Sequence, residues 1–178
     1  MHQIRVLVVE DSLVFRELLV QNLNRDPAIT VVATARDPFE ARDAIIKYKP
    51  DVMTLDVELP RMSGIEFLRK LMPQYPLPVV VISSLSEKVF DALNAGAVDF
   101  VAKPSGAGRE QIEAFIKNEL LVKIKVASIA KVSGWKKAPL PVASQSTIIN
   151  DKNLIVAIGA STGGTIKVFK NLKTIFVV

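Results

Sequence analysis

Short apolar segments alternate with amphipathic segments along the first two-thirds of the chain. Five of the apolar segments are rich in valine, isoleucine or leucine and end at polar residues, which is typical of buried β-strands. These segments cover residues 4–9, 29–35, 52–55, 79–82 and 99–102. The intervening segments predict five helices. Three of them cover residues 12–24, 39–48 and 88–94; of the other two, one ends at Leu71 and one begins at Arg109.

Three of the predicted helices carry clear local signals. In the second, Asp37 is suited to cap the helix and Pro38 to occupy its first position. The fourth is expected to stop at Gly96. The first has the apolar spacing of an amphipathic helix, at Leu13, Val14, Leu18, Leu19 and Leu23.

The alternation of strand and helix predicts the fold class. Apolar strands joined by helical connections favour a parallel sheet that is covered on both faces, because each parallel connection must cross over. We expect an α/β fold, a doubly wound five-stranded parallel sheet of flavodoxin-like strand order. In such a sheet, ligands bind outside the carboxyl ends of the strands.

Polar residues follow four of the five predicted strands at this edge. Glu10 and Asp11 follow the first, Asp56 ends the third, Ser83 ends the fourth and Lys103 follows the fifth. Clustered carboxylates repel one another, and a hard cation such as Mg²⁺ relieves the repulsion. Asp56 could then attack a phosphoryl donor, with Lys103 offsetting charge and the Ser83 hydroxyl bonding a phosphoryl oxygen. The alternative is that these acids are ordinary helix caps or solvated loop residues.

Composition narrows the class of protein. At 178 residues and 49% hydrophobic content, the chain is expected to form one complete domain with a remainder. There is no cysteine, which excludes disulfides. The apolar stretch at the N-terminus is too short for a signal peptide or a membrane span, so we expect a cytoplasmic protein without membrane insertion.

The charge is unevenly distributed. Residues 1–122 carry 14 basic and 17 acidic side chains, whereas residues 123–178 carry nine lysines and one acid, Asp151. A basic tail is compatible with nucleic-acid or membrane contact. Its lysines are spread among Ala, Ser, Val and Pro without helix-turn-helix spacing or a base-reading arginine, which favours a solvated linker over a DNA-binding transcription regulator.

The motifs VVEDS, LDVELPRMSG, VVVISS and DFVAKP resemble those of response regulator receivers, and the stretch ARDPFEARDAIIKYKPDVMTLDVELPRMSG resembles the chemotaxis regulators called protein-glutamate methylesterases. The resemblance implies phosphorylation of a single aspartate by a histidine kinase, with Mg²⁺ as cofactor. Its implied site residues are Asp56 as acceptor, Glu10 and Asp11 as the acidic pair, the backbone carbonyl of Glu58 as a further metal ligand, Ser83 and Phe100 as switch residues and Lys103 as the ammonium. Phe100 is otherwise an ordinary core aromatic.

A second resemblance lies near the end of the chain. LIVAIGASTGG, residues 154–164, resembles the first strand and nucleophile loop of the methylesterase domain, with Ser161 as nucleophile. By spacing alone, the glycines around Ser161 also suit a phosphate-binding loop or an ordinary turn. We therefore expect a receiver over 1–122, a basic linker over 123–153 and a truncated start of a second α/β domain over 154–178.

The expected function is that of a chemotaxis phosphoacceptor response regulator with an incomplete methylesterase effector. A serine nucleophile needs a histidine base, and the only histidine is His2, so esterase activity is not expected from this chain. The alternative is that the sequence is a fragment of an active protein-glutamate methylesterase and glutamine deamidase. In either case, the resemblance implies methyl-accepting chemotaxis receptors as substrates of the complete enzyme.

Overall fold

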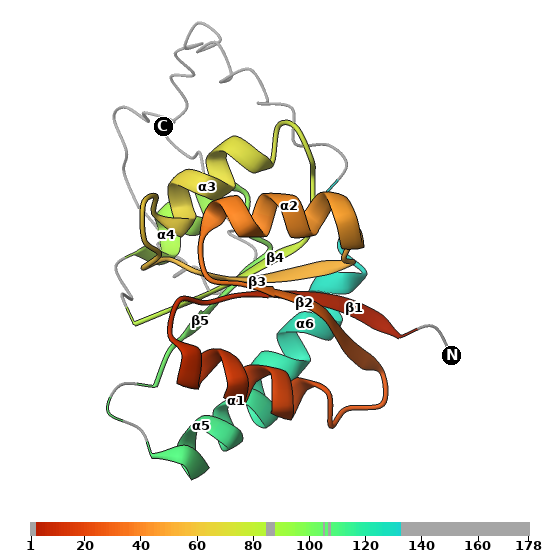
Figure 1. The fold of residues 1–178 in the computed structure, drawn as a ribbon, viewed down its shortest axis with the longest axis vertical. Helices are drawn as coiled ribbons and strands as arrows, with labels where there is room; N and C mark the ends of the chain where they lie inside the picture. Colours follow the sequence, from red (N-terminus) through yellow and green to blue (C-terminus); the bar gives the residue numbers. More distant parts are fainter. Residues whose placement is uncertain (1–2, 85–87, 105, 107, 133–178) are drawn as a thin grey trace, which may run out of the picture. The chain divides into compact units, whose positions relative to one another are not determined.

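A five-stranded parallel sheet carries helices on both faces (Figure 1). The computed structural model describes residues 3–84, 88–104, 106 and 108–132. The strand order is β2-β1-β3-β4-β5, which confirms the predicted doubly wound, flavodoxin-like sheet. The strands are β1 (Ile4–Val9), β2 (Ile29–Ala35), β3 (Val52–Asp56), β4 (Val79–Ser83) and β5 (Asp99–Ala102).

The helices form one layer on each side of this sheet (Figure 1). On one side lie α2 (Pro38–Tyr48), α3 (Gly64–Leu71) and α4 (Val89–Ala95). On the other lie α1 (Leu13–Leu23), α5 (Arg109–Phe115) and α6 (Leu121–Ser128), with a π-helical turn at Ile116–Leu120 between the last two. Strands β3 and β4 are buried along their whole length, because they lie inside the sheet and are covered on both faces.

The predicted helix signals are present. Asp37 caps α2 by accepting hydrogen bonds from the backbone N–H groups of Phe39 at 2.8 Å and Glu40 at 2.9 Å. Arg61 lies 3.3 Å from the same carboxylate and so ties the loop after β3 to the start of α2. Gly96 ends α4 in the left-handed conformation, which glycine adopts without steric cost.

The buried face of α1 contains Leu18, Leu19 and Leu23, as predicted, but not the other two predicted positions. Leu13 and Val14 are 59% and 69% exposed, whereas Phe15 is 9% exposed. The buried positions are spaced by three or four residues from Phe15 onward, which is the spacing of a single helical face. Leu13 and Val14 fall outside that face because they occupy the first turn on the solvent side.

The last helical segment extends past the predicted receiver boundary at residue 122. The run that begins at Arg109 continues through the π-helical turn into α6 and ends at Ser128. Ile124 and Ala127 have no exposed surface and belong to the apolar layer shared with α1. This part of the predicted linker therefore contributes to the core beneath the sheet.

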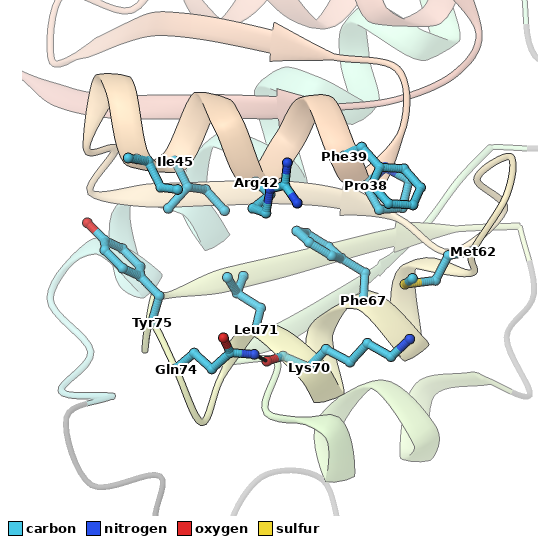
Figure 2. Close-up of a pocket in the computed structure, with 11 residues that line it drawn as sticks. Pro38, Phe39, Arg42, Ile45, Met62, Phe67, Lys70, Leu71, Gln74 and Tyr75 are labelled. Atoms are coloured by element: carbon cyan, nitrogen blue, oxygen red, sulfur yellow. Dashed lines mark hydrogen bonds between the residues drawn. The ribbon is translucent and has the colours of Figure 1, made fainter.

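A groove of about 390 Å³ lies between α2 and α3 (Figure 2). Its lining is mainly apolar and includes Phe39, Ile45, Phe67 and Leu71, with Arg42 and Lys70 as the charged side chains. None of the residues predicted for the phosphoryl site lines it. The groove is thus lined by other residues than those of the candidate phosphoryl site.

Candidate functional site

Three carboxylates meet at the carboxyl edge of the sheet. Glu10, Asp11 and Asp56 each place an oxygen within 4.8 Å of the others. They converge because β1 and β3 are neighbours, with Val9 paired to Leu55, so that the next residue of each strand reaches the same edge. Glu10 and Asp56 are buried and Asp11 is exposed. The cluster offers carboxylate oxygens as ligands, and it is open to solvent at Asp11, as binding of a hard divalent cation requires.

Lys103 reaches the two buried acids from the carboxyl end of β5, across the end of β4. Its Nζ lies 2.7 Å from Asp56 Oδ2 and 2.9 Å from Glu10 Oε2. The backbone N–H of Lys103 donates to the Ser83 carbonyl at 2.8 Å, which fixes the start of its side chain beside β4. The structure therefore brings together the acidic pair, the predicted acceptor and the predicted ammonium.

The electrostatics of the cluster reflect burial of like charges. Burial, together with the charge of Asp56, raises the pKa of Glu10 to about 7, although Lys103 opposes both effects. Burial by itself would lower the pKa of Lys103, but the hydrogen bond and charge of Asp56, together with Glu10, leave the pKa raised. Lys103 is thus a stable cation beside two carboxylates, one of which is costly to ionise.

The turn that carries the acidic pair is held by its own neighbours. Arg16 donates from Nη1 to the backbone carbonyls of Glu10 at 2.6 Å and Asp11 at 3.2 Å. The Ser12 N–H donates to Glu10 Oε1 at 3.2 Å, and the Ser12 hydroxyl caps α1. Sequence reasoning missed Arg16, although an arginine one helical turn after an acidic pair is a visible signal. Its guanidinium restrains the turn through carbonyl oxygens and leaves the carboxylates free to face the cluster.

The loop after β3 contacts Asp56 and reaches across to the loop after β4. The Glu58 N–H donates to Asp56 Oδ1 at 3.1 Å, and the Ser84 hydroxyl donates to Glu58 Oε2 at 2.6 Å. Glu58 thus contacts Asp56 through its amide and Ser84 through its side chain. The role of its carbonyl as a metal ligand stays a prediction.

The two predicted switch residues, Ser83 and Phe100, lie on neighbouring strands in different surroundings. Ser83 is the buried last residue of β4 and pairs with Ala102 of β5. Phe100 is 9% exposed and packs in the apolar layer under α2, α3 and α4. Their proposed switching roles remain predictions, and Ser161 lies outside the described residues.

Gly64 allows the loop after β3 to close against the end of β3. A Cβ atom at this position would lie 1.9 Å from the Asp56 carbonyl oxygen, far inside contact distance. The Gly64 N–H donates to the Val57 carbonyl at 2.9 Å, which brings the start of α3 back to the end of β3. The glycine is therefore needed for close backbone approach beside Asp56.

The sheet order and the strand-end acids together define a receiver-type α/β domain. Residues 6–117 match the response regulator receiver domain family, and the chain belongs to this family. The response regulator domain of Thermotoga maritima CheB is 40% identical, with a TM-score of 0.67 over 73% of this chain and 99% of that one. A phosphorylated cyanobacterial phytochrome response regulator, RcpA, is 25% identical with a TM-score of 0.58, over 66% of this chain and 91% of its own.

Similarity to longer proteins extends over nearly the whole sequence. A protein-glutamate methylesterase/protein-glutamine glutaminase of Syntrophomonas wolfei is 57% identical over 97% of this chain and 50% of its own length. The chain thus spans about half the length of the curated relatives that it matches. In the part that the structure describes, no helix is both long and apolar enough to cross a membrane.

Proposed function

We propose that this chain is the phosphoacceptor part of a chemotaxis response regulator and that Asp56 accepts the phosphoryl group. The observation that carries the proposal is the position of the Lys103 ammonium, 2.7 Å from Asp56 Oδ2 and at the edge of a three-carboxylate cluster. An aspartate so placed has a cation ready to offset the negative charge that arrives with a phosphoryl group.

The transfer consists of an in-line displacement at phosphorus. A bond forms between phosphorus and one Asp56 carboxylate oxygen as the bond to the donor's imidazole nitrogen breaks, and the nitrogen keeps the electron pair. Lys103 balances the charge on the transferred group, and the Glu58 N–H orients the carboxylate. The donor is a phosphorylated histidine kinase, as the receiver family implies.

The acidic cluster also suits Mg²⁺. Glu10 Oε2 is buried and faces the Lys103 ammonium without the geometry of a hydrogen bond, so an acceptor oxygen remains available. Glu10, Asp11 and Asp56 would hold the ion, which neutralises charge on the phosphoryl oxygens when it is bound. Asp11 is the exposed member and the natural point of entry.

Methylesterase activity belongs, in this proposal, to a longer polypeptide. The support is the 57% identity to a methylesterase/glutaminase, which runs through the segment containing Ser161. The only histidine here is His2, so we expect no methanol release from methylated chemoreceptors by this 178-residue chain. Methanol release that disappears in Ser161→Ala would contradict that expectation.

Intact-mass measurement with a small phosphodonor tests the acceptor. The wild-type chain should gain one phosphoryl group in the presence of Mg²⁺, and Asp56→Asn should gain none. Asp43→Asn is the matched control, because Asp43 is an exposed aspartate on α2 that pairs with Arg42. Equal phosphorylation of Asp56→Asn and wild type would overturn the assignment.

Thermal unfolding tests the metal site separately. Mg²⁺ should raise the melting temperature of the wild-type chain, because a ligand that binds the folded state stabilises it. Asp11→Asn should remove most of this rise. An unchanged response in Asp11→Asn would place the ion elsewhere.

A further inference from the structure

The ammonium of Lys103 contacts an aromatic ring as well as the two carboxylates. Its Nζ lies 4.7 Å from the centroid of the Phe15 ring, within the range of a cation–π interaction. We infer that Phe15 is a positioning residue that holds the Lys103 ammonium at Asp56. This inference rests on the proposed phosphoacceptor function and assigns a role in it to a residue of α1.

The ring is the fixed part of this contact. Phe15 is 9% exposed and packs in the apolar layer with residues of β1, β4 and β5, among them Val8, Ile82 and Val101. Its backbone N–H donates to the hydroxyl of Ser12, which caps the same helix. A ring held by close packing and by its own helix cap has little freedom to move away from the site.

The lysine is the part that needs to be held. A lysine side chain has four rotatable bonds and loses much rotamer entropy when it is held in one place. The Lys103 side chain is only 19% exposed, so its ammonium is largely withdrawn from water. Cation–π attraction is strongest under such conditions. The Phe15 ring therefore contacts a side of the ammonium that would otherwise need a water molecule or another hydrogen-bond acceptor as its partner.

An aromatic partner suits phosphoryl transfer better than an anionic one. A further carboxylate would bind the ammonium firmly and neutralise the charge that the phosphoryl group requires. The ring attracts the cation through its quadrupole and leaves the net charge unchanged. Phe15 therefore restricts where Nζ can lie while Lys103 exchanges a carboxylate oxygen for a phosphoryl oxygen.

Fluorinated phenylalanines at position 15 test the electrostatic part of this inference. Fluorine withdraws electron density from the ring face and changes its volume very little. We expect the rate of phosphorylation by a small phosphodonor to fall stepwise along mono-, di- and trifluorophenylalanine, reaching about threefold. The same series at Phe67, which is 7% exposed and lies on the opposite helical layer, should leave the rate unchanged. A flat series at position 15 would overturn the inference.

Phe15→Leu with selective NMR of labelled lysine provides the second test. In the wild type, the Lys103 side-chain protons should be shifted upfield by the ring, and Phe15→Leu should remove that shift and slow phosphorylation by about tenfold. Lys103→Arg identifies the signal. The shift is measured without phosphodonor, so it reports on the Phe15 contact even if Asp56 is not the acceptor. An unshifted wild-type signal would show that the contact does not form in solution.

Discussion

The Ser84 hydroxyl donates to Glu58 Oε2 at 2.6 Å and so joins the loop after β3 to the loop after β4. Glu58 lies two residues after Asp56, and its N–H already donates to that aspartate. Ser84→Ala should change the unfolding free energy little, because the bond is exposed. It should accelerate hydrolysis of the phosphorylated chain by about two- to tenfold, the effect of losing one hydrogen bond.

The decay of phosphorylated protein, followed by intact mass, measures this effect. Ser128→Ala is the control, because the Ser128 hydroxyl makes a similarly exposed hydrogen bond at the end of α6, to the Lys125 carbonyl. Equal decay in Ser84→Ala and Ser128→Ala would show that the bond between the loops has no part in protecting the phosphoryl group.

Gly64→Ala should be strongly destabilising. The new methyl group would meet the Asp56 carbonyl oxygen at 1.9 Å, and the opposing atom is backbone that cannot move without shifting β3. We expect a loss of about 3 kcal/mol or more in the free energy of unfolding, measured with urea. Gly108→Ala has open space around its new Cβ and should cost less than about 1 kcal/mol. Similar losses in both variants would contradict the close approach.

Glu10 should make the metal-free protein less stable as the pH rises. Its pKa is raised to about 7 from 4.5, chiefly by burial, so the folded state binds the proton more tightly than the unfolded state. The unfolding free energy should therefore fall between about pH 4.5 and pH 7, and the full loss should be present above pH 7. Glu10→Gln cannot ionise and should lack this component.

Urea unfolding in EDTA across that range gives the comparison. The stability of wild type minus that of Glu10→Gln should decrease with pH, because all other titrating groups are shared. A difference that stays constant, or increases with pH, would show that Glu10 is not held in a buried, negatively charged environment.

Asp37→Ala should destabilise α2 by about 1 to 2 kcal/mol, because it removes the side chain that caps two backbone N–H groups. Those hydrogen bonds, led by the one from Glu40, also lower the pKa of Asp37. The stability that Asp37 contributes is hence present at neutral pH and lost as the pH falls through its lowered pKa. Asp43→Ala, on the exposed side of α2, should cost less than about 0.5 kcal/mol by the same measurement.

The fold and the polar residues at the strand ends could be predicted from the sequence for physical reasons. Buried parallel strands must be continuously apolar, and a polar residue at the end of each strand can only lie at the sheet edge. Glu10, Asp56 and Lys103 therefore converge for any chain that forms this sheet. Their convergence depends on topology, and the alternation of strands and helices determines that topology.

The side-chain contacts at the carboxyl edge of the sheet were harder to predict from the sequence. The partner of Phe15 is Lys103, at the far end of the predicted receiver, and apolar periodicity placed Leu13 and Val14 on the helical face instead. An apolar residue in the first turn of a helix can lie on the buried face or on the solvent face, and its hydrophobicity alone does not show which. The bond from Ser84 to Glu58 depends likewise on the paths of two loops, which sequence pattern does not specify.

The burial of Ile124 and Ala127 determines where a protease can cut the chain and still release an intact receiver. Cleavage before Ile124 would remove both side chains from the layer beneath the sheet, and that layer would then face water. A peptide bond in this part of α6 must leave its helix before a protease can bind it as an extended strand. The shortest proteolytic fragment that keeps the whole layer consequently ends no earlier than Ala127.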